Sequence, residues 1–173
     1  MLSLPFSPLG LNRTSVTAML AGLVTTSSPD AVLDGYPEYK TSIDQLDIEQ
    51  RRAFNSIAEQ IVQSHLTRDP IDAVAVVGHA DKALRKPVAE RAAFELEVSQ
   101  SRATSARDML LGRVQLLASN AHFSKVLLVV GIGVGNARPI FAHAATEAQM
   151  RKNRRVEIFL FRSHYPPSRC AVR

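Results

Sequence analysis

Residues 71–77 (IDAVAVV) form a short, mostly β-branched run between Pro70 and Gly78. The run is too short for a typical helix and is apolar at almost every position. This pattern is typical of a strand that is buried on both faces. We therefore expect a central strand of a sheet here.

Two longer segments have the apolar period of a helix with one buried face. The first starts at a capping-box pattern, Asp47 to Gln50, and should end near residues 65–67, before Asp69-Pro70. The second runs from Phe94 to about Ala118. Between the central strand and this second helix, residues 83–90 contain Pro87, and we expect a loop there.

Other short apolar runs predict strands at 31–33, 126–130 and 156–161. A second capping-box pattern, Thr146 to Gln149, predicts a short helix through about Asn153. The element order is therefore β, α, β, α, β, short α, β. This alternation favours an α/β sandwich in which two long helices pack on the sheet.

A chain of 173 residues is expected to form one domain, which we place at residues 31–162, with an N-terminal extension at 1–30 and a basic tail at 163–173. The apolar run at 15–24 fits either a secretory signal with Arg13 as its basic flank or a packed extension. No run of eighteen apolar residues is present. Cys170 is the single cysteine, so no internal disulfide can form.

Positive charge is concentrated at the C-terminal end. Residues 151–173 carry a charge of +6, from one acid (Glu157) and seven bases: Arg151, Lys152, Arg154, Arg155, Arg162, Arg169 and Arg173. The whole chain has a net charge of +5, which leaves −1 for the first 150 residues. Such an end could bind nucleic acid or an anionic envelope polymer, or simply be solvated. The lack of interleaved aromatic residues in 151–158 is evidence against nucleic acid.

Asp81 and Arg102 are the strongest candidate site residues. Asp81 follows the central strand, and ligand sites of open α/β sheets gather where strands end. Arg102 lies near the start of the second helix, where a guanidinium can hold a carboxylate in a bidentate pair. An acid and a base at adjoining element ends suit a zwitterion. Each residue also has a simpler interpretation, Asp81 as a turn aspartate that caps local amides and Arg102 as a solvated surface arginine.

Other candidate chemistries are weaker. The glycine-rich stretch 131–135 follows a strand, but Asn136 and Pro139 break the dinucleotide-binding pattern, so we expect glycines that let the chain turn close to a neighbour. His79 and Asp81 could share a metal, yet the other histidines are scattered: His65, His122, His143 and His164. No nucleophile–base set indicates an enzyme. We expect no metal, no cofactor and no catalysis.

Four short segments occur in the order found in a known family: 80–81 (AD), 94–103 (FELEVSQSRA), 133–139 (GVGNARP) and 153–157 (NRRVE). Together they resemble the OmpA-like C-terminal domain, which is also found in MotB stator proteins and in the peptidoglycan-associated lipoprotein. The resemblance covers about residues 32–161. It implies a mixed four-stranded sheet with two long helices packed on it.

The resemblance also implies a location in the cell envelope or periplasm and non-covalent binding of peptidoglycan, with envelope proteins as further partners. In the family, the aspartate and the helix arginine hold the diaminopimelate of the stem peptide, and they match Asp81 and Arg102. Four further positions are implied as binding residues: Ala80, Glu95, Asn153 and Arg154. Nucleic acid is not an expected partner.

Three departures from the family pattern bear on the ligand. Asp81 and Arg102 are 21 positions apart instead of about 15, which we interpret as a longer loop at 82–94. Leu84 replaces a glycine, and Glu95 replaces an asparagine, which exchanges a neutral amide for an anion. The alternative function is therefore a protein-interaction domain of the same fold that has lost peptidoglycan binding.

Overall fold

The computed structural model describes residues 22, 24, 27–118 and 127–162, and the structural statements below refer to these. The elements are, in order, β1 (Ala31–Leu33), the 3-10 helix η1 (Ile43–Gln45), α2 (Ile48–Ser64), β2 (Ile71–Gly78), α3 (Val88–Ala118), β3 (Leu128–Gly133), α4 (Glu147–Asn153) and β4 (Val156–Arg162). Most of the predicted N-terminal extension and the whole of the predicted basic tail lie outside the described residues.

The four strands form one mixed sheet in the order β1-β4-β2-β3. β4 pairs antiparallel with both β1 and β2, and β2 pairs parallel with β3. The predicted central strand is confirmed, because β2 has neighbours on both edges. The predicted fold class, a mixed four-stranded sheet carrying two long helices, is also confirmed.

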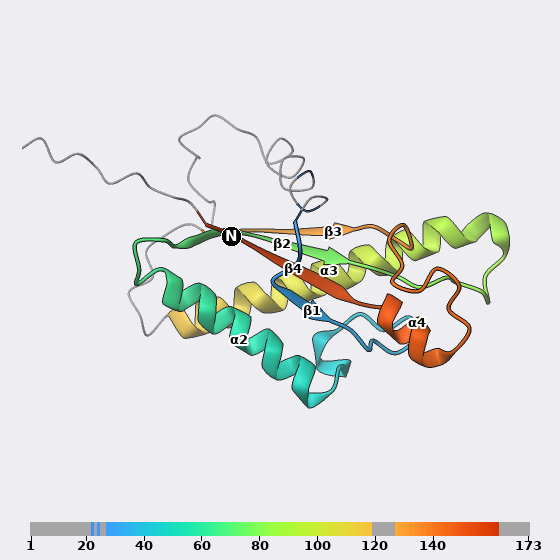
Figure 1. Cartoon of the computed structure of the whole chain (residues 1–173), viewed down its shortest axis with the longest axis horizontal. Helices are drawn as coiled ribbons and strands as arrows, with labels where there is room; N and C mark the ends of the chain where they lie inside the picture. Colours follow the sequence, from blue (N-terminus) through green and yellow to red (C-terminus); the bar gives the residue numbers. More distant parts are fainter. Residues whose placement is uncertain (1–21, 23, 25–26, 119–126, 163–173) are drawn as a thin grey trace, which may run out of the picture.

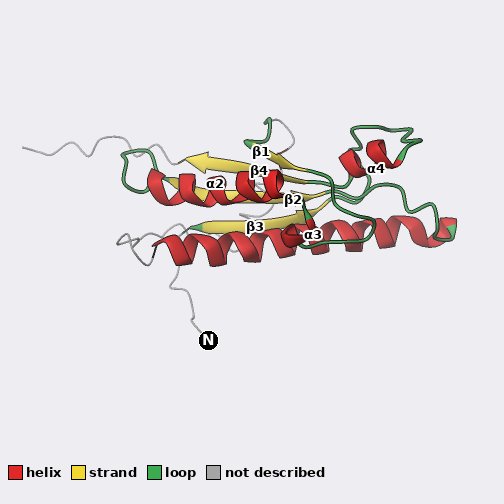
Figure 2. Cartoon of the chain, turned by 90° about the horizontal axis from the view of Figure 1, so that it is seen from below, coloured by secondary structure: helices red, strands yellow, loops and turns green. Residues whose placement is uncertain are grey.

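Both long helices pack on one face of the sheet, where they share the main core with alternate strand residues such as Val74, Val76 and Ile158. Figures 1 and 2 show α2 and α3 side by side along the sheet. The strand residues that alternate with these, including Ala75, Val77 and Phe159, face the opposite side of the sheet and form a second apolar cluster with Val24. No helix within the described ranges is both long and apolar enough to cross a membrane.

Helix α3 begins at Val88, six residues before the predicted start at Phe94. Pro87 explains the difference, since a proline at the start of a helix has no N–H to leave unpaired and already has a helical φ. The predicted loop over 83–90 is therefore wrong from Val88 onward, and much of the added chain in 82–94 lengthens the helix. The first turns of α3 extend past the end of the sheet (Figure 1).

Gly131 and Gly133 lie in β3, and the expectation that they form a turn is wrong. The expected close neighbour is present, because a Cβ on Gly133 would lie 2.5 Å from the backbone nitrogen of Gln100 in α3. A Cβ on Gly78 would lie 2.0 Å from the carbonyl oxygen of Ser99. These two glycines therefore let α3 lie directly against β2 and β3, beside the residues that carry the site.

Candidate functional site

The chain leaves β2 through a short turn that is held from both sides. The backbone N–H of His79 donates to the carbonyl of Arg155 at the start of β4 (2.9 Å), and that of Ala80 donates to the carbonyl of Gly135 after β3 (2.9 Å). Ala80 is buried. The position of Asp81 is thus set by backbone hydrogen bonds to both neighbouring strands, which makes it a rigid carboxylate at the end of the sheet.

Arg102 lies beneath this turn and is fully buried, so its interpretation as a solvated surface arginine is wrong. Its Nε donates to the carbonyl of Lys40 and its Nη1 to that of His79, each at 2.8 Å. The guanidinium lies 5.2 Å from the centre of the Tyr36 ring, a cation–π distance. Its Nη2 is buried with no hydrogen-bond partner among the described residues. Arg102 therefore supports the turn and keeps one donor unused.

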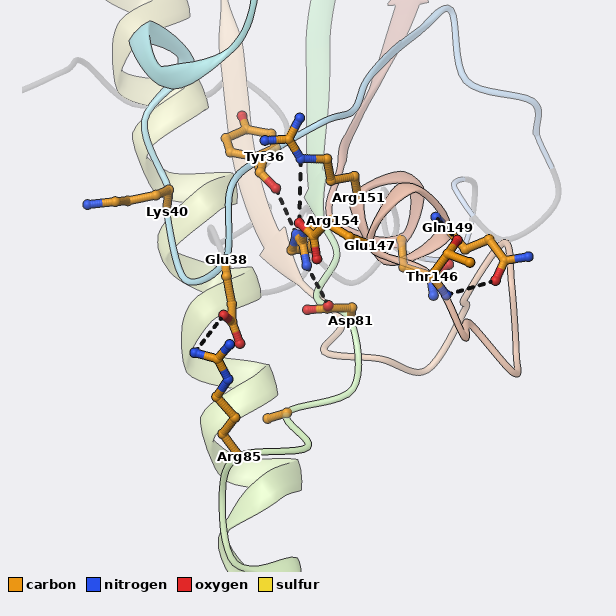
Figure 3. Close-up of polar contacts among 12 residues, drawn as sticks. Tyr36, Glu38, Lys40, Asp81, Arg85, Thr146, Glu147, Gln149, Arg151 and Arg154 are labelled. Atoms are coloured by element: carbon orange, nitrogen blue, oxygen red, sulfur yellow. Dashed lines mark hydrogen bonds and ion pairs between the residues drawn. The ribbon is translucent and has the colours of Figure 1, made fainter.

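Arg154 reaches the same place from the segment between α4 and β4. Its Nη1 donates to Oδ2 of Asp81 at 2.8 Å and its Nε to the carbonyl of Tyr36 at 2.7 Å, while Nη2 pairs with Glu147 (Figure 3). The structure thus brings an arginine of the NRRVE segment to the edge of the sheet that carries Asp81. The direct ion-pair partner of Asp81 is therefore Arg154 and not Arg102.

Burial raises the pKa of the Asp81 carboxyl, and the nearby guanidinium groups of Arg154 and Arg102 offset only part of that effect. Burial likewise lowers the pKa of Arg102 to about 10, although the Asp81 carboxylate and Tyr36 act in the opposite direction. Arg102 therefore remains a cation at neutral pH. The carboxylate of Asp81 would be stabilised further by an added cationic group.

Glu95 fills the space on the α3 side of Asp81. Its carboxylate accepts a hydrogen bond from the backbone N–H of Ala83 at 2.7 Å, and the side chain is buried. The remaining pocket between Tyr39, Asp81 and Val98 holds only about 10 Å³. The position at which the family pattern has an asparagine is thus occupied here by a carboxylate that closes the pocket.

A larger hollow of about 240 Å³ opens on the other side of Asp81, where Asn136, Phe141 and Met150 contribute to its walls. Asn153 also lines it, but its amide is committed to the backbone of Phe141, with one bond donated and one accepted at 2.9 Å each. The Oδ1 atom of Asn136 is buried and has no hydrogen-bond partner in the described part of the chain. Asp81 is therefore accessible to a ligand from this hollow.

A second buried charge group lies beside the site. Arg155 pairs with Glu157 at 2.7 Å, and Nε2 of His79 lies 3.1 Å from the other carboxylate oxygen of Glu157. Burial raises the pKa of Glu157, but the hydrogen bonds and charge of His79 and Arg155 outweigh it, so the pKa falls to about 2. Burial lowers the pKa of His79. Within the described ranges, no cluster of three or more His, Cys, Asp or Glu could hold a metal ion.

The basic segment after residue 150 does not form an open cationic surface over its described part. Arg154 and Arg155 are buried in ion pairs, Arg151 and Lys152 pair with Glu147 and Asp34, and Arg162 lies near Asp69. Most of this charge is matched within the fold. Over residues 151–162, the count of basic residues in the sequence therefore overstates the positive surface.

Three residues that sequence reasoning did not single out complete the site: Tyr36, Glu147 and Glu157. Glu147 carried a signal, because the first turn of a capped helix favours an acid. Glu157 carried one too, as part of the NRRVE segment. Tyr36 lies in a loop with no periodic pattern, and nothing in the sequence indicated that its ring and carbonyl would bind two arginines.

Two solved structures share this architecture. The peptidoglycan-associated lipoprotein from Burkholderia pseudomallei matches over 75% of this chain and 89% of its own, with a TM-score of 0.51 and 16% identity. The periplasmic domain of MotB matches over 94% of this chain and 90% of its own, with a TM-score of 0.50 and 16% identity. The sequence matches no protein-family model and no curated protein. At such low identity the likeness shows a shared fold.

Proposed function

We propose that this chain, which has the fold of the OmpA-like domains, is a non-catalytic module that binds peptidoglycan in the bacterial cell envelope. The group recognised would be the diaminopimelate of the stem peptide, with its ammonium on Asp81 and its carboxylate on Arg102. The observation that carries the proposal is a rigid, partly accessible carboxylate at the end of β2, beside a buried arginine with one unused donor. The two solved structures of the same fold come from a peptidoglycan-associated lipoprotein and a periplasmic domain.

The charge arrangement suits a zwitterion. Asp81 can offer its second oxygen, Oδ1, to an ammonium while Oδ2 stays with Arg154, which also keeps Glu147 and the Tyr36 carbonyl. The carboxylate of the ligand would then meet the positive charge of Arg102, whose pKa of about 10 keeps it ionised. A charge-assisted hydrogen bond of this kind contributes about 1.5–3 kcal/mol. Ala80, Asn153 and Arg154 would support the site by position.

Co-sedimentation with purified sacculi tests this function. Asp81→Asn keeps the side-chain volume and removes the charge, so retention should fall about tenfold or more. Asp108→Asn is the matched control, because Asp108 is an exposed acid on α3 that pairs with its neighbour Arg107 near the surface. Thermal melts confirm that each variant folds. Retention of Asp81→Asn equal to that of the control would overturn the assignment of Asp81.

One observation favours the alternative function, a protein-interaction domain that no longer binds the cell wall. Glu95 closes the pocket on the α3 side of Asp81 and adds a negative charge where a stem-peptide carboxylate would have to enter. If this closure is decisive, the unmodified chain should fail to bind sacculi while Glu95→Asn gains binding. If the ligand enters through the larger hollow instead, Glu95→Asn should change retention little and Asp81→Asn should abolish it.

A further inference from the structure

A groove of about 420 Å³ lies between η1, the first turns of α2 and the C-terminal half of α3. It shares no lining residue with the hollow or the pocket beside Asp81. Its floor is apolar, formed by Ile43, Phe54 and Met109. Two large apolar residues at its edge are well exposed, Ile48 at 52% and Leu116 at 60%. The groove is thus an apolar surface that the described part of the chain leaves open.

Three arginines border this groove, Arg51 and Arg52 from α2 and Arg113 from α3, against a single acid, Asp44. The three arginines and the one aspartate together give the lining a formal charge of +2. None of the three takes part in an ion pair among the described residues. The Nε atoms of Arg51 and Arg113 are also buried with no hydrogen-bond partner there. Elsewhere most of the arginines are paired, so this cluster is distinguished by unused cationic donors.

Gly112 lies in the wall of the same groove, in the interior of α3. A glycine inside a helix is unfavourable relative to alanine. Apart from its chain neighbours and the backbone of α3 itself, no described atom lies within 4 Å of the place where its Cβ would be, in contrast to Gly78 and Gly133, which lie against α3. The missing side chain leaves the backbone of α3 open to a close approach from outside.

The three longer stretches of the sequence outside the described ranges carry no acidic side chain that could pair with these arginines. Residues 1–21, 119–126 and 163–173 contain no aspartate or glutamate. A second copy docked groove to groove would place the three arginines against the same three. Charge complementarity therefore favours a partner protein that presents acidic side chains, and the apolar floor favours apolar side chains between them.

We infer that this groove binds an acidic amphipathic helix of a partner protein. The apolar face of the helix would cover Ile48, Met109 and Leu116, and its carboxylates would pair with Arg51, Arg52 and Arg113. A helix fits because grooves between helices bind partners through apolar residues spaced one turn apart, and because Gly112 allows backbones to approach. This site is separate from peptidoglycan binding and does not depend on it.

A labelled synthetic peptide helix with leucine on one face and glutamate at the flanking positions is the probe, measured by fluorescence anisotropy with the full chain. Binding should weaken about tenfold or more in the Arg51→Glu, Arg113→Glu double variant, because charge-assisted bonds are lost. Gly112→Trp should abolish binding by filling the groove. Gln115→Trp is the control, an exposed α3 residue outside the lining. A peptide with lysine in place of every glutamate should not bind.

Thermal melts and sacculus retention of each variant separate a blocked groove from a damaged fold. Equal binding of the glutamate and lysine peptides, or full binding by Gly112→Trp, would overturn the inference. So would concentration-dependent self-association of the wild-type chain in sedimentation that Gly112→Trp removes, since the occupant would then be a second copy.

Discussion

Arg102 holds the fold together with two of its donors and leaves a third, Nη2, without a partner among the described residues. Its two bonds to the carbonyls of Lys40 and His79 join a loop before α2 to the turn after β2. These segments are distant in sequence, and the guanidinium fork of Arg102 bridges them in a way that a single ammonium cannot reproduce. Arg102 is thus a buried structural residue, whether or not it also binds a ligand.

Arg102→Lys should therefore lower the free energy of unfolding by about 2–4 kcal/mol, because at least one buried carbonyl loses its donor. Urea denaturation measures this change. Arg107→Lys on the same helix is the control, since Arg107 pairs with Asp108 near the surface and should change stability by no more than about 0.5 kcal/mol. Equal stability of the two variants would show that the buried bonds of Arg102 contribute little.

Glu157 should make the protein sensitive to acid. Its pKa is about 2 in the folded protein, below its ordinary value of 4.5, so its ionised form stabilises the fold at any pH above 4.5. That contribution should be lost as the pH falls from 4.5 towards 2. Glu157→Gln should unfold more readily at pH 7, because Arg155 is left buried without its carboxylate, and its stability should fall less steeply below pH 4.5. Parallel pH curves for the two proteins would contradict this account.

At the scale of elements, α3 organises the molecule. It lies against β2 and β3 through Gly78 and Gly133, carries Arg102 and Glu95 to the site, and forms one wall of the separate groove. Its 31 residues span about 46 Å at 1.5 Å per residue, longer than any strand of the sheet. One helix therefore connects the end of the sheet that carries Asp81 with the opposite end of the core.

The same substitution at two glycines should have opposite effects. Gly133→Ala should destabilise the fold by about 2 kcal/mol or more, because its Cβ would lie 2.5 Å from the α3 backbone and the helix would have to move. Gly112→Ala should stabilise it by about 1 kcal/mol, since alanine favours a helix and the space is open. Denaturant midpoints measure both. If Gly112→Ala instead lowered the denaturant midpoint, the absence of a side chain at this position would be needed for stability.

At the scale of the whole molecule, the Asp81 site and the groove are two separate places that share no lining residue. The Asp81 site lies where β2 ends and β4 begins, with α4 beside it (Figure 1). The groove lies between the two long helices and is bordered by arginines that form no ion pair within the described fold. Such an arrangement would let one domain hold a cell-wall polymer and a protein partner at the same time.

A fragment spanning residues 22–162 should fold as the full chain does. The two apolar clusters comprise residues from Val24 to Phe161, and the backbone of Asp30 already bonds to Ile158. We expect the same thermal midpoint and the same sacculus retention as for the full chain. A large fall in midpoint would place part of the core in residues 1–21 or 163–173.

The order of elements was predictable from the sequence because each strand and helix has a local apolar period that survives in the folded chain. The β2 strand, α2, α4 and the end of α3 all follow from such periods and from capping residues. The start of α3 was missed because Pro87 suggests a loop until the helix that follows it is known. The glycines of β3 were placed in a turn because nothing local shows that a helix lies over them.

For the candidate site, too, some features were predictable from the sequence and others depended on the tertiary structure. The sequence by itself placed Asp81 after the central strand and Arg102 on the second helix, since both positions depend only on element order. Tertiary structure decided that Arg102 is buried on two backbone carbonyls, that Arg154 is the ion-pair partner of Asp81, and that Glu95 closes one pocket while another stays open. These facts depend on contacts between residues up to 118 positions apart, as between Tyr36 and Arg154. Local patterns carry no information about such contacts, because they are set by how the layers pack.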